Sequence, residues 1–141
     1  MTRHQGERAM VQSLIAAGIR LAELLVAENR ALAALDLATA AMIAPEKRRA
    51  VEAFTAAEAA LRKAGGKAEG AEREALAALS TRLADLAAGN RRMLERALAA
   101  QDAVVRSLTA AAAPKPALYG PAGAAPGHAV PPQPVGFAAS A

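Results

Sequence analysis

Residues 76–108 read LAALSTRLADLAAGNRRMLERALAAQDAVVRSL, and their larger side chains recur every three or four residues. This spacing places them in a single stripe along one face of a helix. The first half of the stripe is close to a heptad repeat, and the rest drifts as it does in a helix that is not supercoiled. The sequence therefore predicts a long helix over about residues 72–111. Its stripe comprises Leu76, Leu79, Leu83, Leu86, Asn90, Met93, Leu94, Leu98, Gln101, Val104, Val105 and Leu108.

Two further helices are predicted before this one, over about residues 7–35 and 37–63. Between the second and third helices, residues 64–70 contain three glycines and predict a turn. The first helix carries an apolar stripe at Val11, Leu14, Ile15, Ile19, Leu21, Leu25, Leu32 and Leu35, and the second a thinner one at Val51, Phe54, Ala57, Glu58 and Leu61.

The boundary between the first two helices is open in the sequence. Asp36 can accept hydrogen bonds from the free N–H groups of a new helix, but the pattern does not decide whether the chain turns there. Pro45 is tolerated in a first helical turn and disrupts a helix interior. It therefore indicates either a new start at residues 44–45 or a kink in a helix begun near Asp36.

The composition favours an all-α fold and excludes several other classes. Of the 141 residues, 43 are alanine, which is the best helix former and a poor strand residue. We expect residues 1–113 to form an elongated antiparallel three-helix bundle or coiled-coil hairpin. Residues 114–141 hold seven of the eight prolines and have little apolar surface, so we expect a disordered tail.

Catalytic and cofactor chemistry is not predicted. The chain has no cysteine, and both histidines, His4 and His128, lie outside the predicted helices. Small chorismate-mutase-type bundles grip a dicarboxylate with cations on long helices, and Arg20, Arg30 and Lys47 superficially suit that role. Solvent-facing charges explain their spacing equally well, so we expect no enzyme, no metal site and no cofactor.

The formal net charge of +4 does not by itself predict nucleic-acid binding, because positive and negative charges are interleaved and aromatic residues are scarce. Arg20 follows the uncharged apolar stretch of residues 9–19, which is too short to cross a bilayer. Arg20 and Glu23 also interrupt any signal-peptide core. We therefore expect a cytoplasmic protein without a membrane span and without a nucleic-acid partner.

Two polar interruptions stand within the apolar stripes. Glu28 and Asn29 separate Leu25 from Leu32, and Asn90 separates Leu86 from Leu94. A polar residue in a helical seam fixes the register or marks a place where the seam opens. The alternative is that these side chains face water at the edge of the bundle, and the spacing does not choose between the two.

The order of these elements resembles the FlgN family of flagellar export chaperones. The similarity rests on LLVAENRALAALD in the first helix, EKRRAVEAF in the second and LAAGNRRMLERALAAQDAVVRSL in the third. The segment LYGPAG that follows is similar to the Tyr-Gly-x-x-Gly element of that family. The chain departs from the family in its Pro-rich end after Gly123 and in its high alanine content.

The resemblance implies a chaperone that binds the terminal helices of flagellar hook-associated proteins, which form the hook–filament junction, and delivers them to the export gate. Tyr119, Gly120 and Gly123 would then dock on the cytoplasmic domain of the gate. We expect the C-terminal half of the third helix to bind the cargo, since a cargo helix could complete an underpacked bundle. The alternative is a structural coiled-coil protein that only homo-oligomerises, and a homodimer is compatible with either function. The expected cargo residues are Asn90, Leu94, Leu98, Gln101, Val105 and Leu108.

Overall fold

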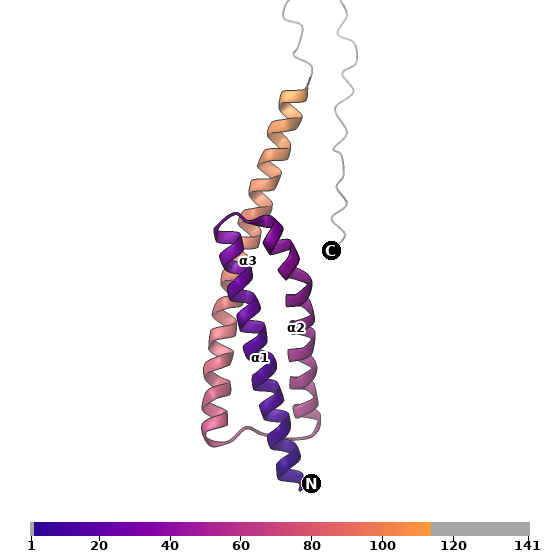
Figure 1. Ribbon diagram of the computed structural model, residues 1–141, viewed down its shortest axis with the longest axis vertical. Helices are drawn as coiled ribbons and strands as arrows, with labels where there is room; N and C mark the ends of the chain where they lie inside the picture. Colours follow the sequence, from indigo (N-terminus) through magenta and orange to yellow (C-terminus); the bar gives the residue numbers. More distant parts are fainter. Residues whose placement is uncertain (1, 114–141) are drawn as a thin grey trace, which may run out of the picture. The chain divides into compact units, whose positions relative to one another are not determined.

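The computed structural model describes residues 2–113, which contain three α-helices and no strand. They are α1 (Arg3–Ala33), α2 (Leu37–Lys63) and α3 (Gly70–Ala112). The predicted all-α fold with three helices is confirmed. One compact unit extends from Met1 to Leu98. Within this unit successive helices run in opposite directions, with α1 in front of α2 and α3 in the view of Figure 1.

The chain turns between α1 and α2 at Asp36. Leu35 adopts a left-handed backbone conformation with φ of 58°, which ends the first helix. The Asp36 carboxylate then caps α2, accepting hydrogen bonds from the Thr39 N–H at 3.1 Å and the Thr39 hydroxyl at 2.6 Å. These bonds, the hydroxyl bond first, lower the pKa of Asp36. The break between the two helices is therefore encoded locally.

Pro45 lies inside α2, which begins just after Asp36 and continues to Lys63. A new helix start at residues 44–45 is therefore wrong. Because proline has no N–H, the carbonyl four residues earlier, at Ala41, loses its usual helical partner. The helix nevertheless continues past Pro45, since Glu46 and Lys47 are helical.

Most of the core comes from α1. Leucine, valine and alanine side chains of this helix pack in three clusters that follow one another along the unit. Ile19 and Leu35 are exposed, so the predicted stripe of α1 is wrong at these two positions. The buried hydrophobic residues are Val11, Leu14, Leu21, Ala22, Leu24, Leu25, Ala31 and Leu32 of α1, Ala40, Ala50 and Leu61 of α2, and Leu79 and Leu83 of α3.

A glycine allows α1 and α3 to approach each other closely. Gly18 is buried, and a Cβ placed on it would lie 2.5 Å from the Leu79 Cδ2 atom and 3.1 Å from Phe54 Cε2. A Cβ at this position would therefore displace the end of the Leu79 side chain and pack tightly against Phe54. The buried seam of α1 passes through Gly18 and leaves Ile19 exposed.

The helix α1 is also long and apolar enough, by length and composition, to cross a membrane. In its most apolar stretch, 39% of the residues are buried inside the bundle. A core helix of a soluble protein and a signal sequence both meet these criteria.

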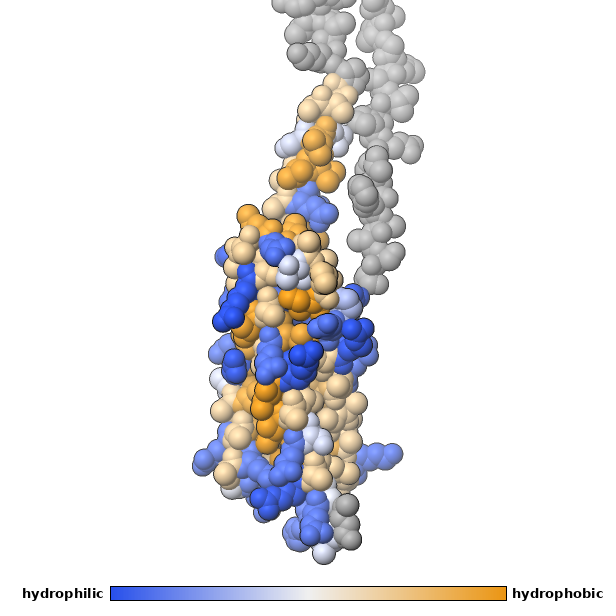
Figure 2. All heavy atoms as spheres, viewed as in Figure 1, coloured by the Kyte–Doolittle hydropathy of each residue, from blue (hydrophilic) through white to orange (hydrophobic). Residues whose placement is uncertain are grey.

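Residues 99–112, the last part of α3, are helical and exposed. Figure 2 shows apolar side chains on the surface of this stretch. They include Val104, Val105 and Leu108.

Candidate functional site

An apolar groove of about 550 Å³ lies between α2 and α3. Leu21 and Leu25 of α1 contribute to its lining, and Val51 and Phe54 line it from α2. Because Val51 is largely exposed and Phe54 only half-buried, these two side chains present apolar surface that the bundle does not cover.

The α3 side of the groove extends from Leu83 to Leu98. These sixteen residues of helix span about 22 Å, or roughly four turns. Leu94 is half-buried and Leu98 is 60% exposed. The apolar surface thus becomes more exposed toward Leu98. Three charged residues, Lys47, Arg91 and Glu95, complete the lining together with Ala84, Ala87 and Asn90.

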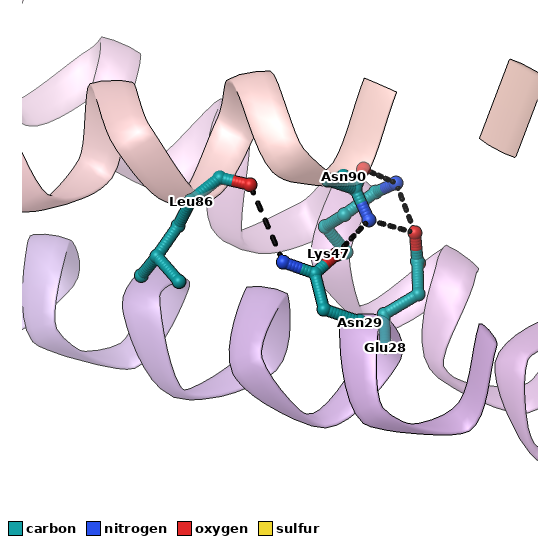
Figure 3. Close-up of polar contacts among 5 residues, drawn as sticks. All are labelled: Glu28, Asn29, Lys47, Leu86 and Asn90. Carbon is teal, nitrogen blue, oxygen red and sulfur yellow. Dashed lines mark hydrogen bonds and ion pairs between the residues drawn. The ribbon is translucent and has the colours of Figure 1, made fainter. Parts of the chain in front are cut away.

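A buried polar cluster connects the three helices beside this groove (Figure 3). The Lys47 ammonium group donates hydrogen bonds to Glu28 Oε1 at 2.8 Å and to Asn90 Oδ1 at 3.1 Å. The Asn90 amide donates to Glu28 Oε1 at 2.6 Å and to Asn29 Oδ1 at 2.9 Å. Asn29 in turn donates to the Leu86 carbonyl at 3.4 Å. One residue of α2 and one of α3 are therefore tied to the same carboxylate of α1.

The cluster lies in the core and not at the edge of the bundle. Glu28 is 1% exposed and Asn90 is 5% exposed. The two polar interruptions of the stripes therefore meet each other, and the alternative of water-facing side chains is wrong for both residues. A buried carboxylate requires a charge partner and hydrogen bonds, which Lys47 and Asn90 supply.

Two polar groups of the cluster keep unused capacity. Glu28 Oε2 is buried without a hydrogen-bond partner among the described residues. An ammonium group has three N–H donors, and Lys47 uses two of them within the cluster. The Lys47 side chain is 16% exposed and is among the residues that line the groove, and its third N–H donor has no partner among the described residues.

The residues predicted to bind cargo occupy different environments. Asn90, Leu94 and Leu98 line the groove. The Asn90 side chain is also hydrogen-bonded to Lys47 and Glu28 in the polar cluster. The other three predicted residues, Gln101, Val105 and Leu108, belong to the exposed stretch 99–112. The predicted docking residues Tyr119, Gly120 and Gly123 lie outside the described residues.

The sequence analysis missed the contribution of α2 to the polar cluster. Lys47 stands four residues before Val51, which continues the spacing Val51, Phe54, Glu58 and Leu61 toward the N-terminus. This spacing was the available signal, but a lysine in a thin stripe is ordinarily solvent-facing. Of the cations considered for a dicarboxylate site, Arg20 pairs with Glu46 at 3.8 Å. Arg30 is exposed, so the three do not share one site.

A second cavity, of about 510 Å³, lies at the end of the bundle that contains the α2–α3 turn and is mostly polar. His4, Glu7, Arg8, Lys67 and Glu72 are among the residues that line it, and Arg8 pairs with Glu72 at 3.1 Å. Within residues 2–113 no group of three or more histidine or carboxylate side chains is placed to hold a metal ion. The α2–α3 groove is therefore the better candidate for binding another molecule.

Comparisons with protein-family models, with curated proteins and with solved structures found no match to this chain.

Proposed function

We propose that the chain is a cytoplasmic chaperone that binds the terminal helices of flagellar hook-associated proteins in the α2–α3 groove and delivers them to the export gate. The observation that carries this proposal is the groove itself, an open apolar surface about four helical turns long in a helical bundle. A helix-in-groove complex uses apolar anchors at three- and four-residue steps, and this groove offers apolar surface of matching length.

The choice of cargo and of the export gate rests on the resemblance to the FlgN family. The resemblance supplies the order of helices and the Tyr-Gly-x-x-Gly element at Tyr119. It also gives Tyr119 a separate role from the groove, since that residue would contact the gate and not the cargo. Tyr119→Ala should therefore retain cargo binding and reduce flagellar secretion.

Co-purification with each hook-associated protein tests the proposal. The double substitution Leu94→Glu with Val105→Glu should abolish cargo binding, because one charge enters the groove and the other enters the exposed row of residues 99–112. Circular dichroism should show that the helix content is largely unchanged, since Leu94 is only half-buried where it packs against the core cluster of α1 and Ala40, and Val105 is exposed. Retained cargo binding in this variant would refute the proposal.

A second function, a structural coiled coil that only homo-oligomerises, is favoured by the exposed apolar residues Leu98, Val104, Val105 and Leu108. Light scattering separates the two functions with the same double variant. In a self-associating coiled coil the molecular mass and the helix content should fall together. In a chaperone only the cargo interaction should be lost.

A further inference from the structure

We infer that the α2–α3 groove selects amphipathic helices whose apolar stripe is interrupted by an acidic residue, which lies against Lys47 and Arg91. The inference rests on the proposed function, because it concerns the chemistry of the helix that occupies the same groove. It goes further by naming the residue type that the occupant must carry at one position along the groove.

Lys47 has one N–H donor that the polar cluster does not use. Lys47 lines an otherwise largely apolar groove, and two of its three N–H donors are bound to Glu28 and Asn90. A helix that seals the groove excludes water from the remaining donor. A buried donor without an acceptor is unfavourable, so a purely apolar stripe is penalised at this level and a side chain with an acceptor oxygen is not.

Arg91 supplies a second positive charge on the α3 side of the groove. Arg91 follows Asn90 directly on α3, lines the groove and is exposed. No ion pair within residues 2–113 involves Arg91. Lys47 on α2 and Arg91 on α3 therefore present two cations at the level of the polar cluster, and a carboxylate of the occupant can interact with both.

The acidic residue of the groove lies at a different level. Glu95 follows Arg91 by four residues, which places it about one helical turn closer to Leu98. Glu28 is buried, and its Oε1 atom accepts hydrogen bonds from Lys47 and Asn90 within the cluster. An occupant carboxylate at the Lys47 level therefore meets cations first, and a positively charged side chain at that level is repelled.

Three synthetic peptides of about 18 residues test this inference. All have leucines at three- and four-residue steps and differ only at one central position in the stripe, which is Glu, Gln or Lys. Isothermal titration calorimetry with the full chain at low salt should give the tightest binding for the Glu peptide. We expect an advantage of about threefold or more over the Gln peptide, the scale of a partly exposed ion pair, and a larger one over the Lys peptide.

Arg91→Gln should reduce the preference for the Glu peptide, whereas Arg92→Gln provides the matched control. Arg92 is the next residue, is also exposed and does not line the groove. The preference should also weaken as salt is raised, because salt screens exposed charges. Equal binding of the three peptides, or a preference for Lys, would overturn the inference.

The outcomes separate this inference from the proposed function. If all three peptides bind equally and Leu94→Glu abolishes that binding, the groove binds helices without acidic selection, and only the inference fails. If no peptide binds, the proposed function fails as well. If light scattering shows that the chain alone forms a dimer that Leu94→Glu dissociates, a second copy occupies the groove, and the inference is overturned.

Discussion

Substitution of Lys47 by methionine tests whether the buried polar cluster is organised as described. Methionine has a similar length and helix propensity but no charge and no N–H donor. The Glu28 carboxylate would keep its hydrogen bond from Asn90 and would lose its cation. Since Glu28 is 1% exposed, water cannot replace that cation without a rearrangement of the helices.

The expected loss is about 3–5 kcal/mol in the free energy of unfolding at neutral pH, the range observed when one partner of a buried ion pair is removed. For a domain of this size, 1 kcal/mol corresponds to a shift of roughly 4–8 °C in Tm, so Tm should fall by more than about 10 °C.

Thermal and urea unfolding followed by circular dichroism measure this effect. The matched control is Arg62→Met, which removes a cation of the same helix from an ion pair of the same 2.8 Å length. The Arg62–Glu58 pair is exposed and should contribute only about 0.3–0.5 kcal/mol. A Lys47→Met variant as stable as Arg62→Met would refute the buried cluster.

Three further predictions concern the fold. Gly18→Ala should lower the free energy of unfolding by about 1–3 kcal/mol, because the new Cβ lies 2.5 Å from a leucine of α3. Gly6→Ala, in open space on the same helix, should instead stabilise the protein by about 0.5–1 kcal/mol. Chemical denaturation measures both changes. The lowered pKa of Asp36 gives stability that is present above its ordinary value of 3.8 and is lost as pH falls through the folded value. Acid titration should therefore destabilise the wild type more than Asp36→Asn, which keeps a capping oxygen, and an equal acid response would contradict this origin. Leu83→Ala should cost about 2–5 kcal/mol and Leu108→Ala less than about 0.5, with similar losses in calorimetry refuting the assigned burial.

The sequence predicted the helices well because their signals are local. Three- and four-residue spacing identified α3, and the glycines of residues 64–70 predicted the turn before it, whereas Asp36 was one of two possible starts of the second helix. These sequence signals do not depend on which helices pack against each other. The predicted positions Leu79 and Leu83 are indeed buried.

Features that depend on the distance between helices were not predictable in the same way. Gly18 is buried in the seam of α1 against Leu79 and Phe54, whereas the larger Ile19, which the spacing indicated, is exposed. The groove was likewise not predicted as a cavity, because its lining combines residues of all three helices. A stripe shows which residues share a face but not how completely a neighbouring helix covers it.

The polar cluster lies between these two cases. Glu28 and Asn90 were visible as interruptions of the stripes, but only the packing of α1 against α3 brings them within 2.6 Å of each other. Lys47 was not recognised as their partner, since exposed and buried lysines look alike in one sequence. The burial of a charged group is a property of its neighbours and not of its own position.

Site-specific crosslinking tests the central claim, that the groove binds a cargo helix, most directly. The chain has no cysteine, so Val51→Cys places a unique thiol in the groove for a photoreactive maleimide label. Met42→Cys is the control, because Met42 is exposed on α2 and does not line the groove. After irradiation with a hook-associated protein, we expect an adduct from position 51 within the terminal helix of the cargo and none from position 42. A stable complex that yields no adduct from position 51, or equal adducts from both positions, would contradict it.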